Sequence, residues 1–229
     1  MGQQETQVLA ADPEEPDPDA IERAAEIIRG GGLVVVPTDT VYGLVCDPRQ
    51  PEAVGRVYRV KGRRREQPLA LLLHDMSQVK AYVEQVPEVA VRAMQHFWPG
   101  ALTVVLRACP ARPWPGRDRG DATAAVRGRR KTIGLRLPAH VVPRLIADSL
   151  GCPLASTSAN RSGQPAPTTA EEACAQLQGL VQLALDAGAA PEGKESTVVD
   201  FSSEPPGVLR VGAISVARLR EVLGEVRVS

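Results

Sequence analysis

The chain has 229 residues, with 27 Lys and Arg side chains against 27 Asp and Glu, so its formal net charge is zero. An apolar fraction of 43% suffices for a sizeable core, and the length suits one large α/β domain or two small ones. The four cysteines form no C-x-x-C pair, which disfavours a zinc ribbon or a disulfide framework. With no visible signal peptide and no apolar run long enough to span a bilayer, we expect a cytoplasmic protein without a membrane partner.

The zero net charge conceals an asymmetry between the N-terminal segment and the rest of the chain. Residues 1–20 contain six acidic and no basic side chains, so residues 21–229 have 27 basic and 21 acidic side chains, a net charge of +6. The segment is also rich in proline, a composition typical of disorder. We therefore predict a disordered acidic tail over residues 1–19 and a folded domain over residues 20–229.

Hydrophobic periodicity predicts alternating helices and strands along the folded part. Asp19 and Glu22 resemble a capping box for the first helix, and three glycines from Gly30 end it. Helices are expected at about 20–29, 51–61, 88–97, 140–150, 169–178 and 215–224. Strands are expected at 33–36, 69–73, 102–107, 133–137, 153–156, 181–185, 197–201 and 208–211. Residues 108–131, rich in Pro, Gly and Arg, are expected to form a long mobile loop. This pattern favours one α/β domain around a mixed sheet.

Polar segments lie next to several of the predicted buried strands. They are Thr38-Asp39-Thr40, the segment from Ser156 to Asn160, and Glu195-Ser196-Thr197. Ligands of open α/β sheets bind in the crevice beyond strand ends, where hydroxyl and amide groups can donate to phosphate or carboxylate oxygens. The same residue types also close turns and cap helices, so each segment taken alone leaves both interpretations open.

Two basic runs are present, one from Arg56 to Arg65 and one from Arg127 to Lys131. The first run falls at a helix end. Its cations could stabilise the helix dipole there, or they could bind a triphosphate. The second could be a solvated loop or an RNA contact. The sequence has no G-x-x-x-x-G-K-[ST] loop, no G-x-G-x-x-G, no H-E-x-x-H and no G-x-S-x-G. These absences disfavour a P-loop nucleotide site, a dinucleotide fold, and metal or serine hydrolases.

Seven ordered segments resemble the YrdC/TsaC family of threonylcarbamoyl-AMP synthases. The match runs in order through Pro37 to Leu44, Lys61-Gly62-Arg63 with Pro68-Leu69, Phe97 to Gly100 with Leu102-Thr103, Gly134 to Pro138, Thr157 to Asn160 with Ser162-Gly163, Ser196 to Asp200, and Arg210 with Gly212. The resemblance covers residues 20–224 and is closest to the short, single-domain form. It implies a single-domain α/β fold in which helices flank a twisted mixed sheet with a positively charged concave face.

The resemblance also implies an activity: L-threonine, bicarbonate and ATP are converted to threonylcarbamoyl-AMP and pyrophosphate, for threonylcarbamoyladenosine modification of tRNA. Expected partners are a tRNA-modifying threonylcarbamoyl transferase complex and tRNA or double-stranded RNA. Lys61 and Arg63 are expected to be catalytic, and Mg²⁺ to accompany ATP without a protein metal site. ATP is expected to contact Lys61, Arg63, Gln67, Thr132, Ser158, Asn160, Ala166 and Arg210. L-Threonine is expected to contact Thr40, Arg136, Ser156 and Ser196.

The sequence departs from the family pattern at two places near the expected nucleotide site. Arg64 and Gln67 stand where the pattern often has Pro and Asn, and Leu72 stands where many members have His. His74 would share the face of Leu72 if residues 69–74 formed a strand. No general base is evident from the sequence, so alignment of the reactants and neutralisation of phosphate charge are expected to dominate catalysis.

Two alternatives differ in class. A non-catalytic RNA-binding module would show strongly salt-dependent tRNA affinity and no ATP consumption. The second alternative is a carbamoyl-transfer domain of the kind fused in hydrogenase-maturation proteins, which share this module. Those proteins carry extra zinc-finger cysteines, so the lack of any C-x-x-C in this chain disfavours this alternative.

Overall fold

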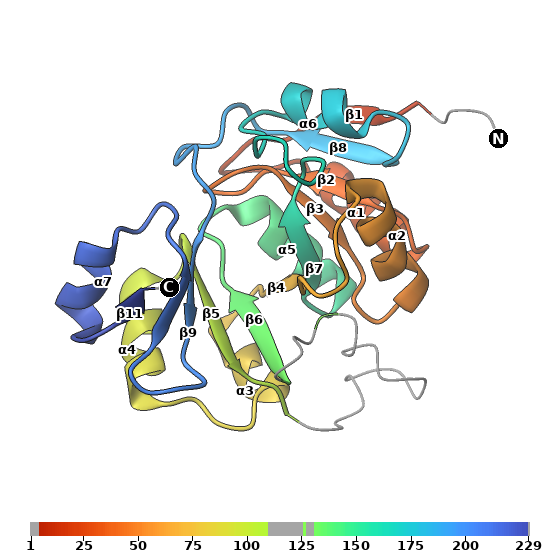
Figure 1. The fold of residues 1–229 in the computed structure, drawn as a ribbon. Helices are drawn as coiled ribbons and strands as arrows, with labels where there is room; N and C mark the ends of the chain where they lie inside the picture. Colours follow the sequence, from red (N-terminus) through yellow and green to blue (C-terminus); the bar gives the residue numbers. More distant parts are fainter. Residues whose placement is uncertain (1–4, 110–125, 127–130, 229) are drawn as a thin grey trace.

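The computed structural model describes residues 5–109, 126 and 131–228. These residues form one mixed sheet with the strand order β1-β8-β2-β3-β7-β4-β6-β5-β9-β10-β11. Figure 1 shows the sheet twisting from β1 and β8 at the top to β5 and β9 at the lower left. The strands are β1 (Gln7–Ala10), β2 (Val34–Val36), β3 (Gly43–Cys46), β4 (Ala70–Leu72), β5 (Leu102–Arg107), β6 (Thr132–Arg136), β7 (Leu154–Ser158), β8 (Leu183–Asp186), β9 (Thr197–Asp200), β10 (Gly207–Arg210) and β11 (Arg227–Val228).

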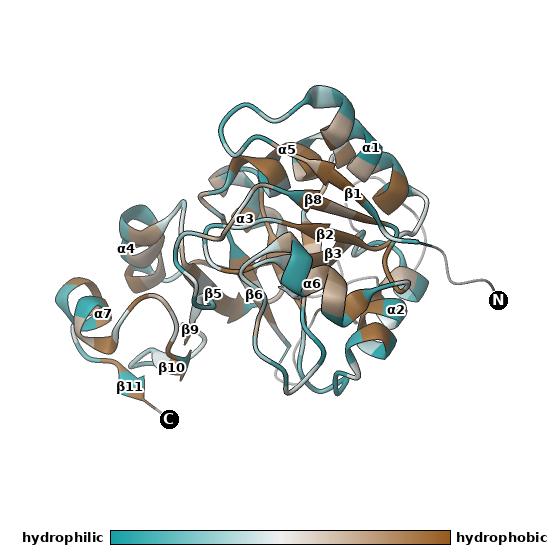
Figure 2. Cartoon of the chain, turned by 90° about the horizontal axis from the view of Figure 1, so that it is seen from above, coloured by the Kyte–Doolittle hydropathy of each residue, from teal (hydrophilic) through white to brown (hydrophobic). Residues whose placement is uncertain are grey.

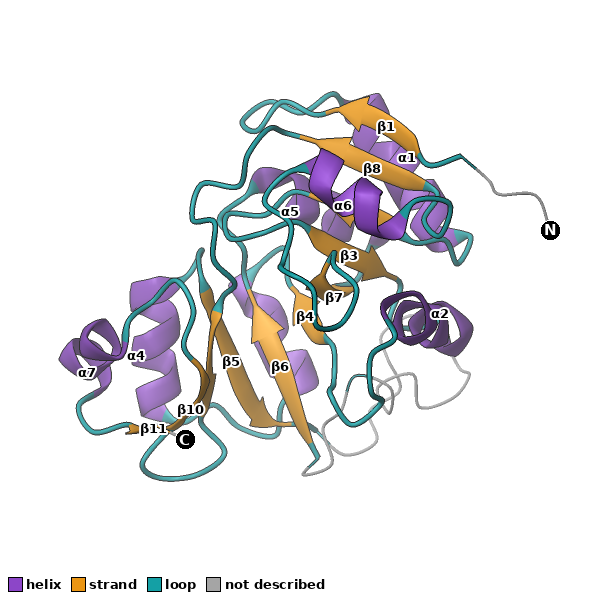
Figure 3. Cartoon of the chain, turned by 45° about the horizontal axis from the view of Figure 1, so that its top comes forward, coloured by secondary structure: helices purple, strands orange, loops and turns teal. Residues whose placement is uncertain are grey.

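Helices flank this sheet and pack against its strands and one another. Helix α5 contacts β4 and α1, and α4 contacts β5 and α7; Figure 3 shows α4 and α7 together beside β5. The described helices are α1 (Pro18–Arg29), α2 (Pro51–Lys61), the 3-10 helix η1 (Met76–Gln78), α3 (Val79–Tyr82), α4 (Glu88–Phe97), α5 (Val141–Leu150), α6 (Ala170–Leu177) and α7 (Val216–Leu223). Within the described residues, no helix is long and apolar enough to cross a membrane.

Local sequence explains where the helices near the N-terminus begin and end. Pro18 begins α1, and the Asp17 carboxylate caps it by accepting from the Asp19 backbone N–H. Pro51 begins α2, which has no side-chain cap. Gly62 ends α2 in the left-handed region with φ 63°, a conformation that glycine adopts without steric cost. The chain therefore turns immediately after Lys61, and Arg63 leaves the helix axis.

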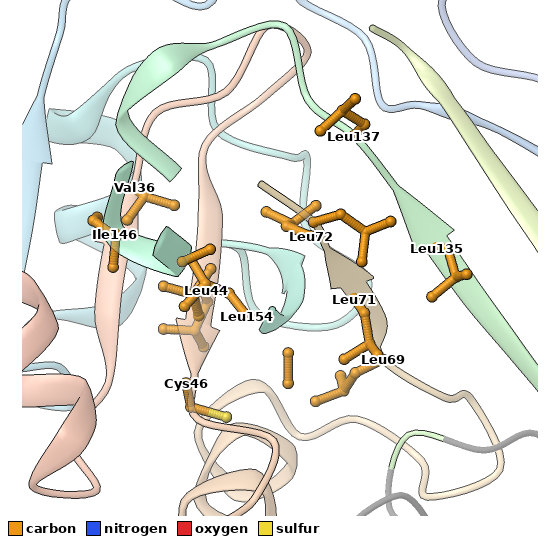
Figure 4. Close-up of a cluster of buried hydrophobic side chains, with 14 of the residues drawn as sticks. Val36, Leu44, Cys46, Leu69, Leu71, Leu72, Leu135, Leu137, Ile146 and Leu154 are labelled. Atoms are coloured by element: carbon orange, nitrogen blue, oxygen red, sulfur yellow. The ribbon is translucent and has the colours of Figure 1, made fainter. Parts of the chain in front are cut away.

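The core is built mainly from aliphatic side chains. Figure 4 shows Leu44, Leu71, Leu135 and Leu154 of four neighbouring strands gathered with Ile146 of α5, and all five are fully or almost fully buried. Each such side chain stabilises the fold by roughly 1.5–3 kcal/mol. Figure 2 shows the hydrophobic strands β2 and β8 between helices that carry both polar and apolar residues.

Small side chains lie in register across the centre of the sheet. Ala70 of β4 pairs with Ser156 of β7 and with Gly134 of β6, and Gly134 pairs with Val105 of β5. Because successive side chains of a strand alternate between faces, these four residues share one face with Arg136, two residues beyond Gly134. Helix α5 lies against the opposite face (Figure 1). This arrangement leaves room for a ligand above the small residues.

The predicted fold class, one α/β domain with helices around a twisted mixed sheet, is confirmed. Helices α2 and α4 and strand β5 have the predicted bounds. Four elements were missed: β1, β3, the short η1–α3 segment and β11. Most of the predicted loop 108–131, and the basic run from Arg127 to Lys131 except Lys131 itself, lie outside the described residues.

The predicted disordered tail is wrong for the part that the structure describes. Residues Gln7–Ala10 form β1, which pairs in parallel with β8 from Gln7↔Leu183 to Ala10↔Asp186. Backbone hydrogen bonds of a sheet edge do not require apolar side chains, so composition alone does not reveal such a strand. Helix α1 also begins earlier than predicted, because Asp17 rather than Asp19 caps it.

Candidate functional site

A cleft of ≈ 530 Å³ opens on the face of the sheet that carries the small residues. We call it the central cleft. Its lining comes from β3, β4, β5, β6, β7, β9 and β10 and from the adjoining loops. Nine of the twelve predicted substrate residues line it: Arg63, Gln67, Thr132, Ser158 and Arg210 from the ATP set, and Thr40, Arg136, Ser156 and Ser196 from the threonine set.

Lys61 lies behind Ser158 and joins the two segments that were predicted to share a nucleotide site. Its Nζ atom donates to the carbonyl oxygen of Ser158, to the carbonyl oxygen of Asn160 at 2.6 Å and to Asn160 Oδ1 at 2.9 Å. Ser158 Oγ donates to the same Oδ1 atom at 2.6 Å. We call Lys61, Ser158 and Asn160 the Lys61 cluster. It brings the end of α2 against the end of β7.

Burial and hydrogen bonding act on the charge of Lys61 in opposite directions. Burial and the nearby Arg63 charge lower the pKa of Lys61 to about 7, and the charge of Glu195 opposes this effect. Three acceptors surround Nζ, which matches the three protons of the ammonium form. The pKa of Lys61 therefore lies far below its usual range, while the geometry around Nζ suits the charged state.

Arg63 is held by the loop that follows it. Its Nε atom donates to the Gln67 carbonyl oxygen at 2.9 Å, its Nη2 atom to the Pro68 carbonyl oxygen at 3.2 Å, and its Nη1 atom to Thr157 Oγ1 at 3.4 Å. All three acceptors are neutral. Burial lowers the pKa of Arg63 from its ordinary value, so the partly desolvated guanidinium favours an anionic ligand in the cleft.

Arg136, at the end of β6, is fixed on three sides. Its Nη2 atom donates to Asp39 Oδ1 at 2.8 Å, its Nη1 atom to Thr40 Oγ1 at 2.8 Å, and its Nε atom to the Gly100 carbonyl oxygen at 3.0 Å. Burial lowers the pKa of Arg136, and the Asp39 carboxylate opposes this effect. We call Asp39, Thr40 and Arg136 the Arg136 cluster. It presents a rigid guanidinium group to the cleft.

Ser196 and Arg210 form the third polar group of the cleft. Ser196 Oγ lies 2.8 Å from Thr103 Oγ1 and accepts from Arg210 Nη2 at 3.1 Å. Arg210 Nη1 donates to Glu195 Oε1 at 2.6 Å, in a half-exposed ion pair. The charge of Arg210 lowers the pKa of both Arg63 and Arg136, which places it within electrostatic reach of both clusters.

Sequence comparison identifies relatives over almost the entire chain. The family model Sua5/YciO/YrdC, described as "Telomere recombination", matches residues 26–212. The chain belongs to the Sua5/YciO/YrdC family. A putative threonylcarbamoyl-AMP synthase of Mycobacterium leprae is 40% identical over 217 residues, 93% of this chain and 94% of the relative. The threonylcarbamoyl-AMP synthase of Bacillus subtilis is 36% identical over 208 residues, 91% of this chain and 58% of the relative.

Solved Sua5 and YciO structures share the fold. The crystal structure of Pyrococcus abyssi Sua5 complexed with L-threonine has a TM-score of 0.89 and 32% sequence identity; the match covers 98% of this chain and 63% of that one. Escherichia coli YciO has a TM-score of 0.81 and 29% identity, over 93% of this chain and 99% of that one. This chain therefore spans less than two thirds of the Pyrococcus chain and nearly all of YciO.

Three residues predicted from the YrdC/TsaC resemblance do not line the central cleft. Lys61 and Asn160 lie just behind its wall, in contact with Ser158. Ala166 is half-buried and also outside the lining. Gln67 lines the cleft, but it binds Arg63 through its backbone oxygen rather than through its side-chain amide.

Leu72 and His74 do not share an environment. Leu72 lines the cleft, but β4 ends there, and His74 is absent from the lining. The His74 Nε2 atom lies 3.7 Å from Asp148 Oδ1, on helix α5. The same-face arrangement required a strand through residue 74, so His74 does not take the place of a histidine at position 72.

The sequence did not assign several polar residues that the structure places in or beside the cleft. Asp39 anchors Arg136, Thr103 contacts Ser196, Thr157 contacts Arg63, and Glu195 pairs with Arg210. Asp39 and Glu195 belong to the polar segments noted beside the strands, but their partners are distant in sequence. Period-2 alternation from Val105 would have placed Thr103 on the cleft face.

Proposed function

We infer that this chain is an L-threonylcarbamoyladenylate synthase, which forms threonylcarbamoyl-AMP and pyrophosphate from L-threonine, bicarbonate and ATP. The observation that carries this inference is the central cleft, in which Arg63 and Arg136 are held by separate sets of residues above a floor of small residues. Two mycobacterial relatives that match 93% of the chain are named putative threonylcarbamoyl-AMP synthases, and one related Sua5 structure contains L-threonine. The reaction needs two ligands in one cleft, and the Arg63 side and the Arg136 side supply one binding site each.

ATP is assigned to the side of the cleft bounded by Arg63, Ser158 and Arg210. Guanidinium groups bind phosphate oxygens through paired N–H donors, and the Ser158 hydroxyl adds a neutral donor. Lys61 supports this wall from behind and adds positive charge, and Thr132 lies on the same face of β6 as Arg136. The proposed nucleotide set remains Lys61, Arg63, Gln67, Thr132, Ser158, Asn160, Arg210 and the backbone near Ala166, with Lys61 and Arg63 as the principal groups acting on phosphate.

L-Threonine is assigned to Arg136, Thr40, Ser156 and Ser196. The five N–H groups of Arg136 include three that are already bonded to Gly100, Thr40 and Asp39, so two remain for the substrate carboxylate. Ser156 pairs with Ala70 at the cleft floor, and the threonine methyl group is assigned to these small side chains. A methyl-sized pocket separates threonine from serine by roughly 1–3 kcal/mol.

The chemistry follows from holding these two substrates together. The threonine amine combines with CO2 derived from bicarbonate to give a carbamate, and a carbamate oxygen attacks the α-phosphorus of ATP. The bond between the α-phosphorus and the bridging oxygen breaks, and pyrophosphate leaves with the electron pair. Positioned cations compensate the charge that develops on the phosphates, and fixed orientation lowers the entropic barrier.

Mg²⁺ is proposed to enter with ATP. Within the described residues, no group of three or more His, Cys, Asp or Glu side chains is placed to hold a metal ion. The donor set of the cleft, mostly guanidinium and hydroxyl groups with the carboxylates of Glu66 and Glu195, fits an ion coordinated chiefly by phosphate oxygens. Mg²⁺ bound with the nucleotide would supply positive charge beside Arg63 and Arg210 and neutralise part of the phosphate charge.

The adenylate is proposed to pass to a tRNA-modifying threonylcarbamoyl transferase complex. A direct contact with tRNA or double-stranded RNA is proposed through exposed arginines on α2 and just after it, including Arg59, Arg64 and Arg65. Such a contact would weaken steeply with added salt.

Detection of the product tests the proposed function. The purified chain is incubated with ATP, Mg²⁺, bicarbonate and L-threonine, and pyrophosphate and the acyl-adenylate are followed by coupled assay and mass spectrometry. We expect both products, and neither when threonine or bicarbonate is omitted. Tight RNA binding without an adenylate would instead support the non-catalytic RNA-binding module.

A further inference from the structure

The Arg63 side and the Arg136 side of the central cleft differ in how their cations are paired. The Arg136 cluster contains one cation and one buried carboxylate, joined by the Arg136–Asp39 pair at 2.8 Å with side chains 7% and 11% exposed. Arg63 and Lys61 donate to carbonyl, amide and hydroxyl oxygens, which are neutral. Arg136 is therefore paired with a buried carboxylate, whereas Arg63 and Lys61 donate to neutral oxygens and Glu195, on the same side, is paired with Arg210.

The ligands of the proposed function differ in the same way. ATP is a polyanion, whereas L-threonine is a zwitterion with a net charge near zero. We propose that Asp39 is a specificity-determining residue, which cancels the charge of Arg136 so that its subsite accepts an amino acid and excludes phosphate anions. This inference rests on the proposed function and names a residue that acts on substrate choice without touching the reacting atoms.

The geometry around Asp39 supports this role. Asp39 Oδ1 also accepts from the Ala139 backbone N–H at 3.1 Å, and the Asp39 carbonyl oxygen accepts from the Glu192 N–H at 3.1 Å. The carboxylate is thus fixed to the segment after β6, and its backbone to the loop that leads to Ser196. Because Thr40 and Gly100 bind the other two nitrogens of Arg136, the guanidinium keeps its orientation independently of Asp39. Removal of the Asp39 charge should therefore change electrostatics more than geometry.

Loss of the Asp39 charge is expected to strengthen anion binding at Arg136. With Asp39 neutral, Arg136 becomes a buried cation without a counter-ion and attracts the anion of highest charge that fits. Inorganic phosphate would then compete with threonine. One unit charge within a buried pair changes the binding of a dianion by about tenfold or more at a protein-like dielectric constant. In the wild-type chain the compensated guanidinium recognises the threonine carboxylate by the direction of its N–H groups.

The experiment compares Asp39→Asn with the wild-type chain and with Asp47→Asn. Asp47 accepts hydrogen bonds from Arg49 at 2.9 Å in another largely buried pair, with Asp47 and Arg49 side chains 1% and 13% exposed, and neither residue lines the cleft. Asp47→Asn therefore reproduces the loss of a buried pair away from the site. The affinity for L-threonine is measured by calorimetry with and without inorganic phosphate, at constant ionic strength.

We expect phosphate to raise the apparent Kd of Asp39→Asn for L-threonine by about tenfold or more, with no change in the wild-type chain or in Asp47→Asn. A Kd of Asp39→Asn that is independent of phosphate would overturn the proposal, whether the affinity itself rises or falls. If Asp39→Asn does not fold, the wild-type chain provides the second measurement: saturating threonine should leave its phosphate affinity unchanged, and displacement of phosphate by threonine would refute the role of Asp39. A wild-type chain that binds no threonine would instead refute the proposed function, and this inference with it.

Discussion

The ammonium group of Lys61 donates hydrogen bonds to both the carbonyl oxygen and the Oδ1 atom of Asn160, at 2.6 Å and 2.9 Å. This contact joins the C-terminus of α2 to the segment after β7, 99 positions later in the chain. It makes one wall of the central cleft depend on a single buried amine. The protonation state of that amine should therefore respond to the ligand.

ATP binding is predicted to draw a proton onto Lys61. Burial lowers the pKa of Lys61 to about 7 from its ordinary value of 10.5, so a substantial part of the amine is neutral at pH 8. Phosphate charge nearby favours the ammonium form and raises this pKa. Calorimetric titrations with an ATP analogue at pH 8, in buffers of different ionisation enthalpy, should show net proton uptake by the wild-type chain.

Lys61→Met is the control for this proton uptake, because Met keeps a similar length and cannot titrate. Its proton uptake should vanish, and its affinity for the analogue should fall. Equal proton uptake by both chains would mean that another group takes the proton and that Lys61 does not sense the phosphates.

Gly212→Ala is predicted to destabilise the chain and to disturb the cleft. An added Cβ atom would lie 2.0 Å from the Glu195 carbonyl oxygen and 2.6 Å from the Ser196 carbonyl carbon, so backbone must move. Overpacking of this kind costs about 1–3 kcal/mol. Thermal unfolding should show a lower Tm, and the KM for threonine should rise because Ser196 is displaced.

Gly207→Ala is the matched control for Gly212→Ala. It lies on β10, and no atom beyond its chain neighbours is within 4 Å of its added Cβ. Its Tm and threonine KM should equal those of the wild-type chain. An unchanged Tm for Gly212→Ala would show that the 195–197 segment is free to move.

His74→Ala is predicted to leave catalysis intact. His74 lies beyond the end of β4, beside Asp148 of α5, and does not line the cleft. Steady-state kinetics should give unchanged KM values for ATP and L-threonine. A tenfold loss of kcat/KM without a change in Tm would contradict the placement of His74 outside the site.

The sequence predicts elements well where local signals are strong. Pro51 and Gly62 bracket α2, and the helical spacing of Val54, Val57 and Tyr58 fixes its buried face. Strand β3 was missed because Gly43-Leu44-Val45-Cys46 follows a turn-rich segment, and its strand character comes from pairing with β2 and β7 on both sides. Strand β1 was missed because its pairing with β8 joins residues more than 170 positions apart.

The candidate site, too, could be predicted from the sequence only in part. Polar residues next to buried strands can be found from the hydrophobic pattern, and the family resemblance indicates which ligand each of them should contact. The partner of each charge could not be found, since Asp39 and Arg136 are 97 positions apart and meet only through the register of the sheet. The sequence also does not mark the end of β4 at Leu72, and the face on which His74 lies depends on that end.

Crossed binding measurements on two variants test the central claim most directly, namely that one cleft holds ATP on the Arg63 side and threonine on the Arg136 side. Calorimetry is performed on Arg63→Ala and Arg136→Ala, with Arg59→Ala as a control, because Arg59 is exposed on α2 and outside the cleft. Arg63→Ala should lose about 10- to 100-fold in affinity for an ATP analogue and keep its threonine affinity. Arg136→Ala should lose threonine affinity by a similar factor and keep its affinity for the ATP analogue. In each variant the cause is the loss of a charge-assisted hydrogen-bonding group. Equal loss of both ligands in both variants, or no loss in either, would contradict this division of the cleft.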